Sequence, residues 1–298
     1  MLTLWLGYCG MVSGCFAVWN LNDGSGEVAG ILSGLMRIPA AMNGFLEKGL
    51  PRFRGDERLV GVAAGGSWIR GTLDEQSDVD LVVVARDDAF ARMMNDRMEI
   101  ARGLGPLLVA FTGEHVGEPR LLICLYGPPL VHVDLKFVAL KDFAARVEDP
   151  AVLWERDGAL TALLAATKSE WPAPQLQWIE DRFWVWVHYA AGKLARGELF
   201  EVMDMLTYMR SMILGPLVMQ AEGQRAQGAR RIETHAVSWV PKLRETIATY
   251  DARSCGDSLE AAVMMYRELR ERLAGKDLVR RTEAEQEVME YLKSVRRD

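Results

Sequence analysis

Residues 59–85 read LVGVAAGGSWIRGTLDEQSDVDLVVVA, which is two short apolar runs joined by a polar segment rich in glycine. The first run, residues 59–64, ends in a Gly-Gly-Ser turn. The second run, residues 78–85, begins with two aspartates and continues into three valines. Short β-branched runs bounded by turn residues are typical of buried strands. We therefore expect two core strands on either side of this glycine turn.

The two aspartates of the second run are predicted to bind a metal ion. Side chains alternate between the faces of a strand, so Asp78 and Asp80 project to the same side. Buried like charges repel each other unless a cation lies between them. Mg²⁺ prefers oxygen ligands, takes one or two protein carboxylates, and completes its shell with water and substrate phosphates. The pattern therefore predicts a magnesium site at this end of the strand.

A third carboxylate comes from residues 130–138, another alternating run, in which His132, Asp134 and Lys136 share one face. If this strand lies beside the first acidic strand, Asp78, Asp80 and Asp134 converge and could hold two metal ions for an in-line phosphoryl displacement. Asp134 could then also accept the proton of the incoming hydroxyl group. The alternative is a structural role for Asp134, as the partner of Lys136 or of a neighbouring arginine.

The glycine turn supplies a candidate phosphate site. Glycines allow backbone N–H groups to approach an anion closely, so Gly66 and Ser67 are predicted to hold phosphate groups. Arg70, three residues after Ser67, could reach the same phosphates or could instead pair with Asp74 or Glu75. Both readings of Arg70 stay open from the sequence.

The remaining pattern predicts an α+β protein, in which a domain of short strands and helices is followed by an all-helical domain. A helix is expected from residue 38 to residue 50, where Pro51 should end it, and further strands are expected at residues 107–112 and 120–126. After Asp149-Pro150 the short apolar strands give way to long segments of helical periodicity. We therefore expect a first domain at residues 36–149 and a helical domain at residues 150–298.

Together these residues resemble the nucleotidyltransferases of the DNA polymerase beta superfamily. That family has a Gly-Ser turn, a D-x-D or D-x-E strand and a third acid, which are matched here by Gly66-Ser67, Asp78-x-Asp80 and Asp134. The resemblance covers roughly residues 38–138. It implies that the first domain is a mixed sheet flanked by helices, that Asp78, Asp80 and Asp134 bind Mg²⁺, and that the Gly-Ser turn holds a nucleoside triphosphate. With its helical second half, the chain looks most like the antibiotic (aminoglycoside) adenylyltransferases.

One helical stripe of the second half carries cationic and aromatic side chains. Its best candidate for a contact with the nucleotide is Lys193, although a stripe of this kind is more often half core and half surface. The same region offers acids that could replace Asp134 as the general base, for example Glu180 or Glu201.

The balance of acidic and basic residues limits which acceptors the protein can bind. The chain has 35 Lys and Arg against 41 Asp and Glu, a formal net charge of −6. It therefore has no general basic field to hold a long nucleic acid, and the acidic excess suits a cationic acceptor. The four cysteines form no metal-binding or disulfide pattern, which favours a reducing, cytoplasmic location.

Residues 1–35 are expected to be an appendage to this fold. The first 22 residues carry no charge, and glycines dilute their apolar character. No cationic start precedes the apolar run, so the segment lacks the pattern of a secretory signal. A membrane anchor is the less favoured interpretation, because no Lys or Arg flanks the segment before Arg37. Translation from upstream of a natural start at Met36 or Met42 is a further alternative.

The predicted function is therefore the Mg²⁺-dependent transfer of a nucleoside monophosphate, AMP from ATP, to a hydroxyl group of a small molecule such as an aminoglycoside, with release of pyrophosphate. One alternative keeps this chemistry but has a macromolecule, such as tRNA or protein, as the acceptor. Another is a module that binds nucleotides without catalysis.

Overall fold

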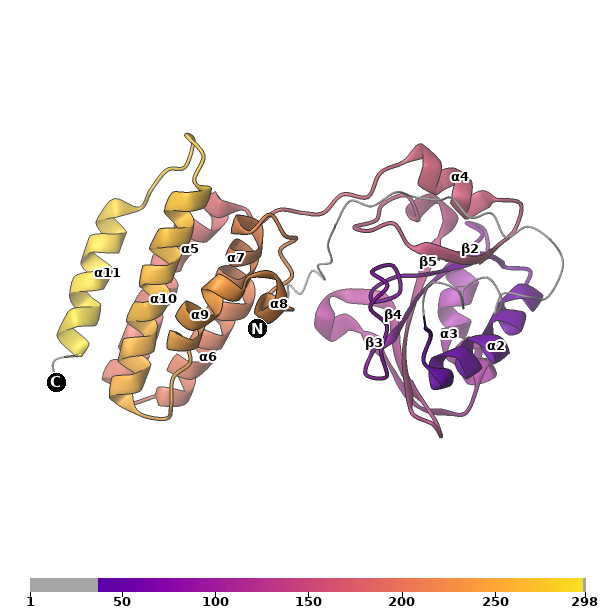
Figure 1. Ribbon diagram of the computed structural model, residues 1–298, viewed down its shortest axis with the longest axis horizontal. Coiled ribbons are helices and arrows are strands. Elements are labelled where there is room, and N and C mark those ends of the chain that lie inside the picture. Colours follow the sequence, from indigo (N-terminus) through magenta and orange to yellow (C-terminus); the bar gives the residue numbers. More distant parts are fainter. Residues whose placement is uncertain (1–36, 297–298) are drawn as a thin grey trace. The chain divides into compact units, whose positions relative to one another are not determined.

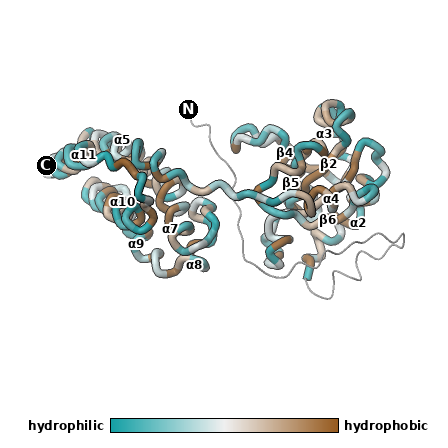
Figure 2. The backbone as a smooth tube through the Cα atoms, turned by 90° about the horizontal axis from the view of Figure 1, so that it is seen from above, coloured by the Kyte–Doolittle hydropathy of each residue, from teal (hydrophilic) through white to brown (hydrophobic). Residues whose placement is uncertain are grey.

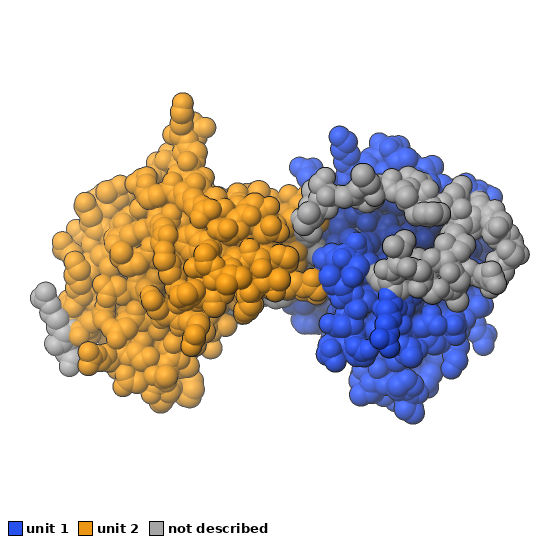
Figure 3. All heavy atoms as spheres, in the orientation of Figure 1, with its two compact units in different colours: residues 1–7, 12–170 blue, residues 8–11, 171–298 orange. Residues whose placement is uncertain are grey.

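The computed structural model describes residues 37–296, and these divide between Glu170 and Trp171 into two units (Figure 3). The predicted leader, residues 1–35, lies outside the described residues. Among the described helices, none is long and apolar enough to cross a membrane.

The first unit is built on a six-stranded sheet with the strand order β3-β4-β5-β2-β1-β6. Neighbouring strands are antiparallel except β2 and β5, which are parallel. The strands are β1 (Leu59–Ala64), β2 (Val79–Ala85), β3 (Leu107–Gly113), β4 (Glu118–Tyr126), β5 (Val131–Ala139) and β6 (Ala151–Glu155). The first five were predicted from the sequence.

Two faces of this sheet are covered by different helices. Helices α2 (Ala40–Gly55) and α3 (Phe90–Leu104) share a core with the odd-numbered residues of β2 and β5, including Leu81 and Leu135. Helix α4 (Ala159–Ala166) packs on the opposite face, where Leu160 meets Val84 and Val138. Because strand side chains alternate, the even-numbered acids Asp80 and Asp134 lie on the same face of the sheet as Val84 and Val138, the face on which α4 packs. Both acids are partly buried there.

Helix α2 continues through Pro51 to Gly55, so the expectation that this proline ends the helix is wrong. Proline removes the N–H that would bond to the carbonyl of Glu47, but both Pro51 and Glu47 are exposed, so water can satisfy that carbonyl. Leu50 and Phe53 on the other side of the helix are buried in the core. Burial of these side chains holds the last turn in helical form despite the lost hydrogen bond.

The second unit is helical, as predicted. Its long helices are α5 (Leu176–Ala195), α6 (Leu199–Met209), α10 (Ala252–Leu273) and α11 (Thr282–Val295). A π-helical turn (Arg210–Leu214) leads from α6 into α7 (Gly215–Ala221), and two short helices, α8 (Ile232–His235) and α9 (Val240–Glu245), precede α10 (Figure 1).

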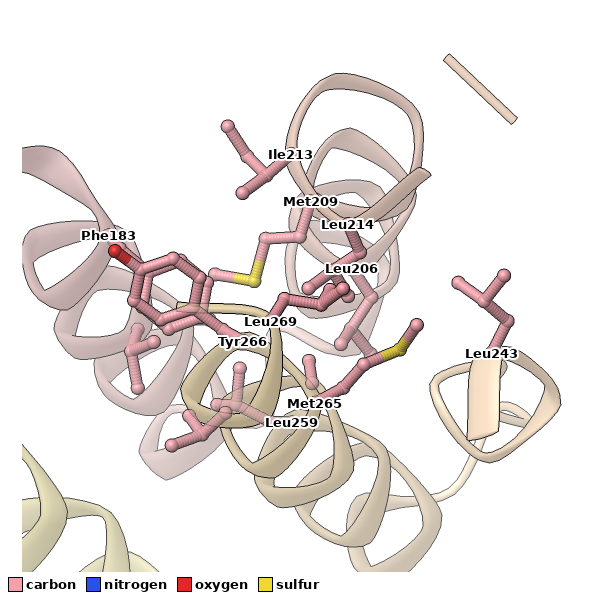
Figure 4. Packing of buried hydrophobic residues seen from close by; sticks show 14 of the residues in the cluster. Phe183, Leu206, Met209, Ile213, Leu214, Leu243, Leu259, Met265, Tyr266 and Leu269 are labelled. Carbon is pink, nitrogen blue, oxygen red and sulfur yellow. The ribbon is translucent and has the colours of Figure 1, made fainter. Parts of the chain in front are cut away.

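The core of this unit lies between α5, α6, α7 and α10 (Figure 4). Phe183 of α5 stacks on Tyr266 of α10 with ring centroids 3.9 Å apart. Helix α11 is largely hydrophilic (teal in Figure 2), as expected for the charged end of the chain. Its buried residues Met289 and Leu292 nevertheless join the core, because α11 packs against α5.

The structure divides the chain later than the boundary expected at residues 149 and 150. Strand β6 pairs with β1, and α4 packs on the same sheet, so residues 150–170 belong to the first unit. The sequence AVLWE of β6 is only five residues long, so it carries little strand signal. The α+β class with a mixed sheet followed by helices is confirmed.

Candidate active site

The two acidic strands are neighbours in the sheet. β2 and β5 pair in parallel, and Asp80 lies directly across from Asp134 in their register. Asp78 immediately precedes β2, two positions from Asp80. One carboxylate oxygen from each of these three residues lies within 4.8 Å of the other two. The structure therefore brings together the three acids that the sequence singled out.

The environment of Asp134 disfavours a negative charge on it. Burial raises the pKa of Asp134, the nearby His132 lowers it, and the carboxylate of Asp78 raises it again. His132 Nε2 lies 3.2 Å from Asp134 Oδ1. Lys136, the alternative partner that the sequence suggested for Asp134, instead places its Nζ 2.9 Å from Glu118 Oε2. The net effect is an acidic site that would gain from a cation.

The chemistry of these donors fits a divalent metal ion. All three are carboxylates, all are partly buried, and their oxygens lie close enough to coordinate one ion. Hard oxygen donors of this type suit Mg²⁺, whereas the site contains no thiolate that would favour a softer metal. Asp78, Asp80 and Asp134 are therefore the residues that would hold Mg²⁺.

The Gly-Gly-Ser turn lies against this acidic site. Gly66 has φ +58°, and a Cβ built on it would lie 1.7 Å from Asp80 Oδ2. The backbone N–H of Gly65 donates to the carbonyl of Asp80 at 3.0 Å, so the turn is also bonded to β2. Ser67 is buried, with 3% of its surface exposed. The backbone of the turn that carries Gly66 and Ser67, the two residues predicted to hold phosphate, is thus held beside Asp80.

Glu148 also reaches this turn, and the sequence analysis missed it. The Gly66 N–H donates to Glu148 Oε1 at 3.0 Å. A Cβ on Gly65 would lie 2.9 Å from the same oxygen, so glycine at position 65 is what allows the carboxylate to approach. The contact joins residues 82 positions apart, and no local pattern in the sequence marks it.

The other two predicted nucleotide contacts are Arg70 in the first unit and Lys193 in the second. Arg70 is partly buried in the loop between the glycine turn and β2. Lys193 belongs to α5 in the second unit, where its Nζ lies 2.6 Å from Glu198 Oε2 and 3.6 Å from Glu201 Oε2. Their roles toward a nucleotide remain predictions.

Of the two alternative general bases, Glu180 has a structural role. Its side chain is fully buried in the second unit, where Tyr266 Oη donates to Oε2 at 2.5 Å and Arg270 Nη1 donates to Oε1 at 3.1 Å. The backbone N–H of Arg281 donates to Oε1 at 2.9 Å. Both oxygens of Glu180 are thus occupied inside the helical core. Glu201 is exposed and accepts a hydrogen bond from Tyr189 Oη at 2.6 Å.

Comparison with solved structures finds distant likenesses over most of the chain. An aminoglycoside 6-adenyltransferase from Bacillus subtilis is 17% identical, with 84% of this chain and 97% of that chain covered and a TM-score of 0.36. A nucleotidyltransferase-like protein from Exiguobacterium sibiricum 255-15 is 12% identical, with coverages of 85% and 89% and a TM-score of 0.36. A STING-associated CdnE c-di-GMP synthase from Capnocytophaga granulosa is 15% identical, with coverages of 78% and 81% and a TM-score of 0.30. Likenesses this distant assign no substrate.

No curated protein matches this sequence. Residues 46–112, however, match the family model of the nucleotidyltransferase domain. The matched span contains the glycine turn and both acids of the D-x-D strand, Asp78 and Asp80, and ends before Asp134. These residues therefore belong to a nucleotidyltransferase domain, as the resemblance of the sequence motifs implied.

Proposed function

We propose that this enzyme transfers AMP from ATP to a hydroxyl group of a small cationic molecule, such as an aminoglycoside, and releases pyrophosphate. The observation that carries the proposal is the register of β2 and β5, which sets Asp80 across from Asp134 with Asp78 close by. Three partly buried carboxylates that converge lower the stability of the fold unless they bind a cation. Nucleotidyl transfer is a reaction that needs such a cation beside phosphates.

In this reaction the hydroxyl oxygen of the acceptor attacks the α-phosphorus of the nucleotide. A new P–O bond forms, the bond from the α-phosphorus to the bridging oxygen breaks, and its electron pair leaves with pyrophosphate. In the proposed mechanism Asp134 accepts the proton of the hydroxyl group, and Gly66 and Ser67 bind the triphosphate. Mg²⁺ held by Asp78, Asp80 and Asp134 would neutralise the charge that develops on the phosphate oxygens and the leaving group.

Charge supports a small cationic acceptor over a long nucleic acid. The net charge of −6 attracts cations and repels polyanions, and no excess of Lys and Arg is present to offset this. An aminoglycoside carries several ammonium groups together with the hydroxyl groups that the reaction consumes. The cysteine pattern supports a cytoplasmic location.

The proposal is tested by measuring pyrophosphate release from the full chain with Mg²⁺, each ribonucleoside triphosphate in turn, and a panel of aminoglycosides. We expect release with ATP and at least one aminoglycoside, and no release from the Asp78→Asn, Asp80→Asn double variant. Asp277→Asn is the matched control, because Asp277 is exposed in a loop of the second unit. Activity that persists in the double variant would contradict the proposed site.

The alternative acceptors give different results in a parallel experiment. Cell lysate is incubated with the enzyme and ATP labelled on the α-phosphate. A labelled protein or tRNA band, without turnover of any aminoglycoside, would identify a macromolecular acceptor. Binding of ATP without turnover of any acceptor would instead identify a nucleotide-binding module.

A further inference from the structure

The phosphate turn already holds an anion that belongs to the protein. Glu148 lies in the loop between β5 and β6, and its Oε1 accepts the Gly66 N–H at 3.0 Å. Its other oxygen, Oε2, is buried and has no hydrogen-bond partner among residues 37–296. A carboxylate oxygen and a phosphate oxygen are equivalent acceptors for a backbone N–H. The contact therefore shows that this N–H is placed to receive an anion.

The approach of Glu148 depends on the glycines of the turn. A Cβ on Gly65 would lie 2.9 Å from Glu148 Oε1 and 3.8 Å from the Cβ of Asp80. Glu148 thus lies beside the turn and beside the strand that carries Asp80. A fourth carboxylate here adds to the negative charge of Asp78, Asp80 and Asp134, and its hydrogen bond from the Gly66 N–H offsets part of that repulsion.

We propose that Glu148 occupies the place of a nucleotide phosphate on the Gly66 N–H and is displaced when a nucleotide binds. The inference rests on the proposed function, because it takes Gly66 as a phosphate-binding residue. One N–H cannot donate fully to two anions, and a phosphate beside the carboxylate would be repelled by it. Binding of a nucleotide therefore includes the loss of the Gly66–Glu148 hydrogen bond. Glu148 makes binding weaker than the turn alone would allow.

Glu148 competes only with phosphate groups for the Gly66 N–H, and a neutral residue at position 148 removes this competition. Glu148→Gln keeps the size of the side chain and removes its charge, and Glu148→Ala removes the competing acceptor as well. The matched control is Glu57→Gln, which makes the same charge change at an exposed residue of the same unit. Thermal unfolding followed by circular dichroism establishes that each variant is folded.

The experiment is isothermal titration calorimetry of the full chain with Mg²⁺ and, separately, ATP, the other three ribonucleoside triphosphates, inorganic tripolyphosphate and adenosine. We expect both Glu148 variants to bind ATP and tripolyphosphate about 10- to 150-fold more tightly than the wild type, the range for loss of one charged hydrogen bond. Adenosine should bind all proteins equally, and Glu57→Gln should match the wild type.

Three outcomes would overturn the inference. Equal affinity of wild type and Glu148→Gln for ATP would show that Glu148 does not compete with phosphate. Weaker binding by Glu148→Gln would show that Glu148 supports the nucleotide or its metal ion. In both cases the proposed function survives, because the wild type still binds ATP. If no triphosphate binds to any of the proteins, both the inference and the proposed function fail.

Discussion

Gly66 and Asp80 lie so close together that a single methyl group on Gly66 would come within 1.7 Å of Asp80 Oδ2. The turn and the strand that carries Asp80 are therefore fitted to each other at the level of individual atoms. Since Gly66 also has a positive φ of +58°, two separate constraints require glycine at this position.

The first prediction compares two glycines with the same backbone conformation. Gly71 has φ +64°, but a Cβ there would meet nothing within 4 Å, so Gly71→Ala pays only for the left-handed conformation, about 1 kcal/mol. Gly66→Ala has the same strain and must also displace the Asp80 carboxylate. We expect it to lose at least about 3 kcal/mol of unfolding free energy and about 100-fold in pyrophosphate release. Urea unfolding and the turnover assay measure these effects, and similar values for the two variants would contradict the fit between Gly66 and Asp80.

The second prediction concerns metal removal. In EDTA, Asp134→Asn should raise the melting temperature by about 1–3 °C, because it removes a partly buried negative charge that faces Asp78. Excess Mg²⁺ should raise the melting temperature of the wild type and have little effect on the variant, since the ion binds the folded wild-type site. The matched control Asp277→Asn should follow the wild type in both conditions. A variant that loses stability in EDTA and still responds to Mg²⁺ would count against a metal site at Asp134.

The third prediction separates structure from catalysis in the second unit. Glu180→Gln should lower the unfolding free energy by about 2–4 kcal/mol, because Arg270 and Tyr266 lose a charged partner in a buried site. The rate of turnover well below the melting temperature should be unchanged, since Glu180 is enclosed in the helical core. Glu201→Gln, at a side chain that is half exposed, should lower the unfolding free energy much less than Glu180→Gln does. Loss of turnover in a fully folded Glu180→Gln variant would restore Glu180 as a candidate base.

The fourth prediction concerns acid stability of the first unit. Burial by itself raises the pKa of Glu118, but hydrogen bonds from Arg120 and Lys136 outweigh it and lower the pKa to about 2, from 4.5 in the unfolded chain. A lowered pKa in the folded state gives stability that is present above pH 4.5 and is lost as the pH falls toward 2. Since Arg120 and Lys136 are partly exposed, solvent screening reduces the effect to about 1–2 kcal/mol.

Glu118→Gln tests this expectation. Urea unfolding should show the variant to be less stable than the wild type at pH 7, with a difference that shrinks steadily below pH 4.5. Glu57→Gln, at an exposed residue of the same unit, is the control. A difference that stays constant from pH 7 to pH 3 would show that the pair does not hold the pKa of Glu118 down.

Strand alternation explains why the sequence predicted the acidic site. Asp78 and Asp80 flank a buried valine, and Asp134 lies between Val133 and Leu135, so burial of the apolar residues dictates where the acids point. The position of these acids follows from two local patterns and one assumption, that the strands are neighbours. The pairing of β2 with β5 confirms that assumption.

Features that depend on distant contacts could not be predicted in the same way. Glu148 reaches Gly66 through the fold rather than through the local sequence, and Lys136 finds Glu118 on the neighbouring strand instead of Asp134. Strand β6 forms by pairing with the edge of β1. Its own five residues do not predict this pairing. Pro51 stays helical because Phe53 is buried beyond it. In each case tertiary packing decides between local alternatives that are close in free energy.

Core packing also disfavours a shifted register of β2 and β5, which would disrupt the acidic site. If β5 slipped by one residue, Asp134 would turn into the apolar layer beneath α2 and α3, and Leu135 would emerge among the acids. Such a sheet would bury an unpaired carboxylate and expose a leucine, so it would be disfavoured before any substrate was present. Packing of the hydrophobic core thereby selects the register of β2 and β5. A chain that reaches the stable fold has therefore already brought its three acids together.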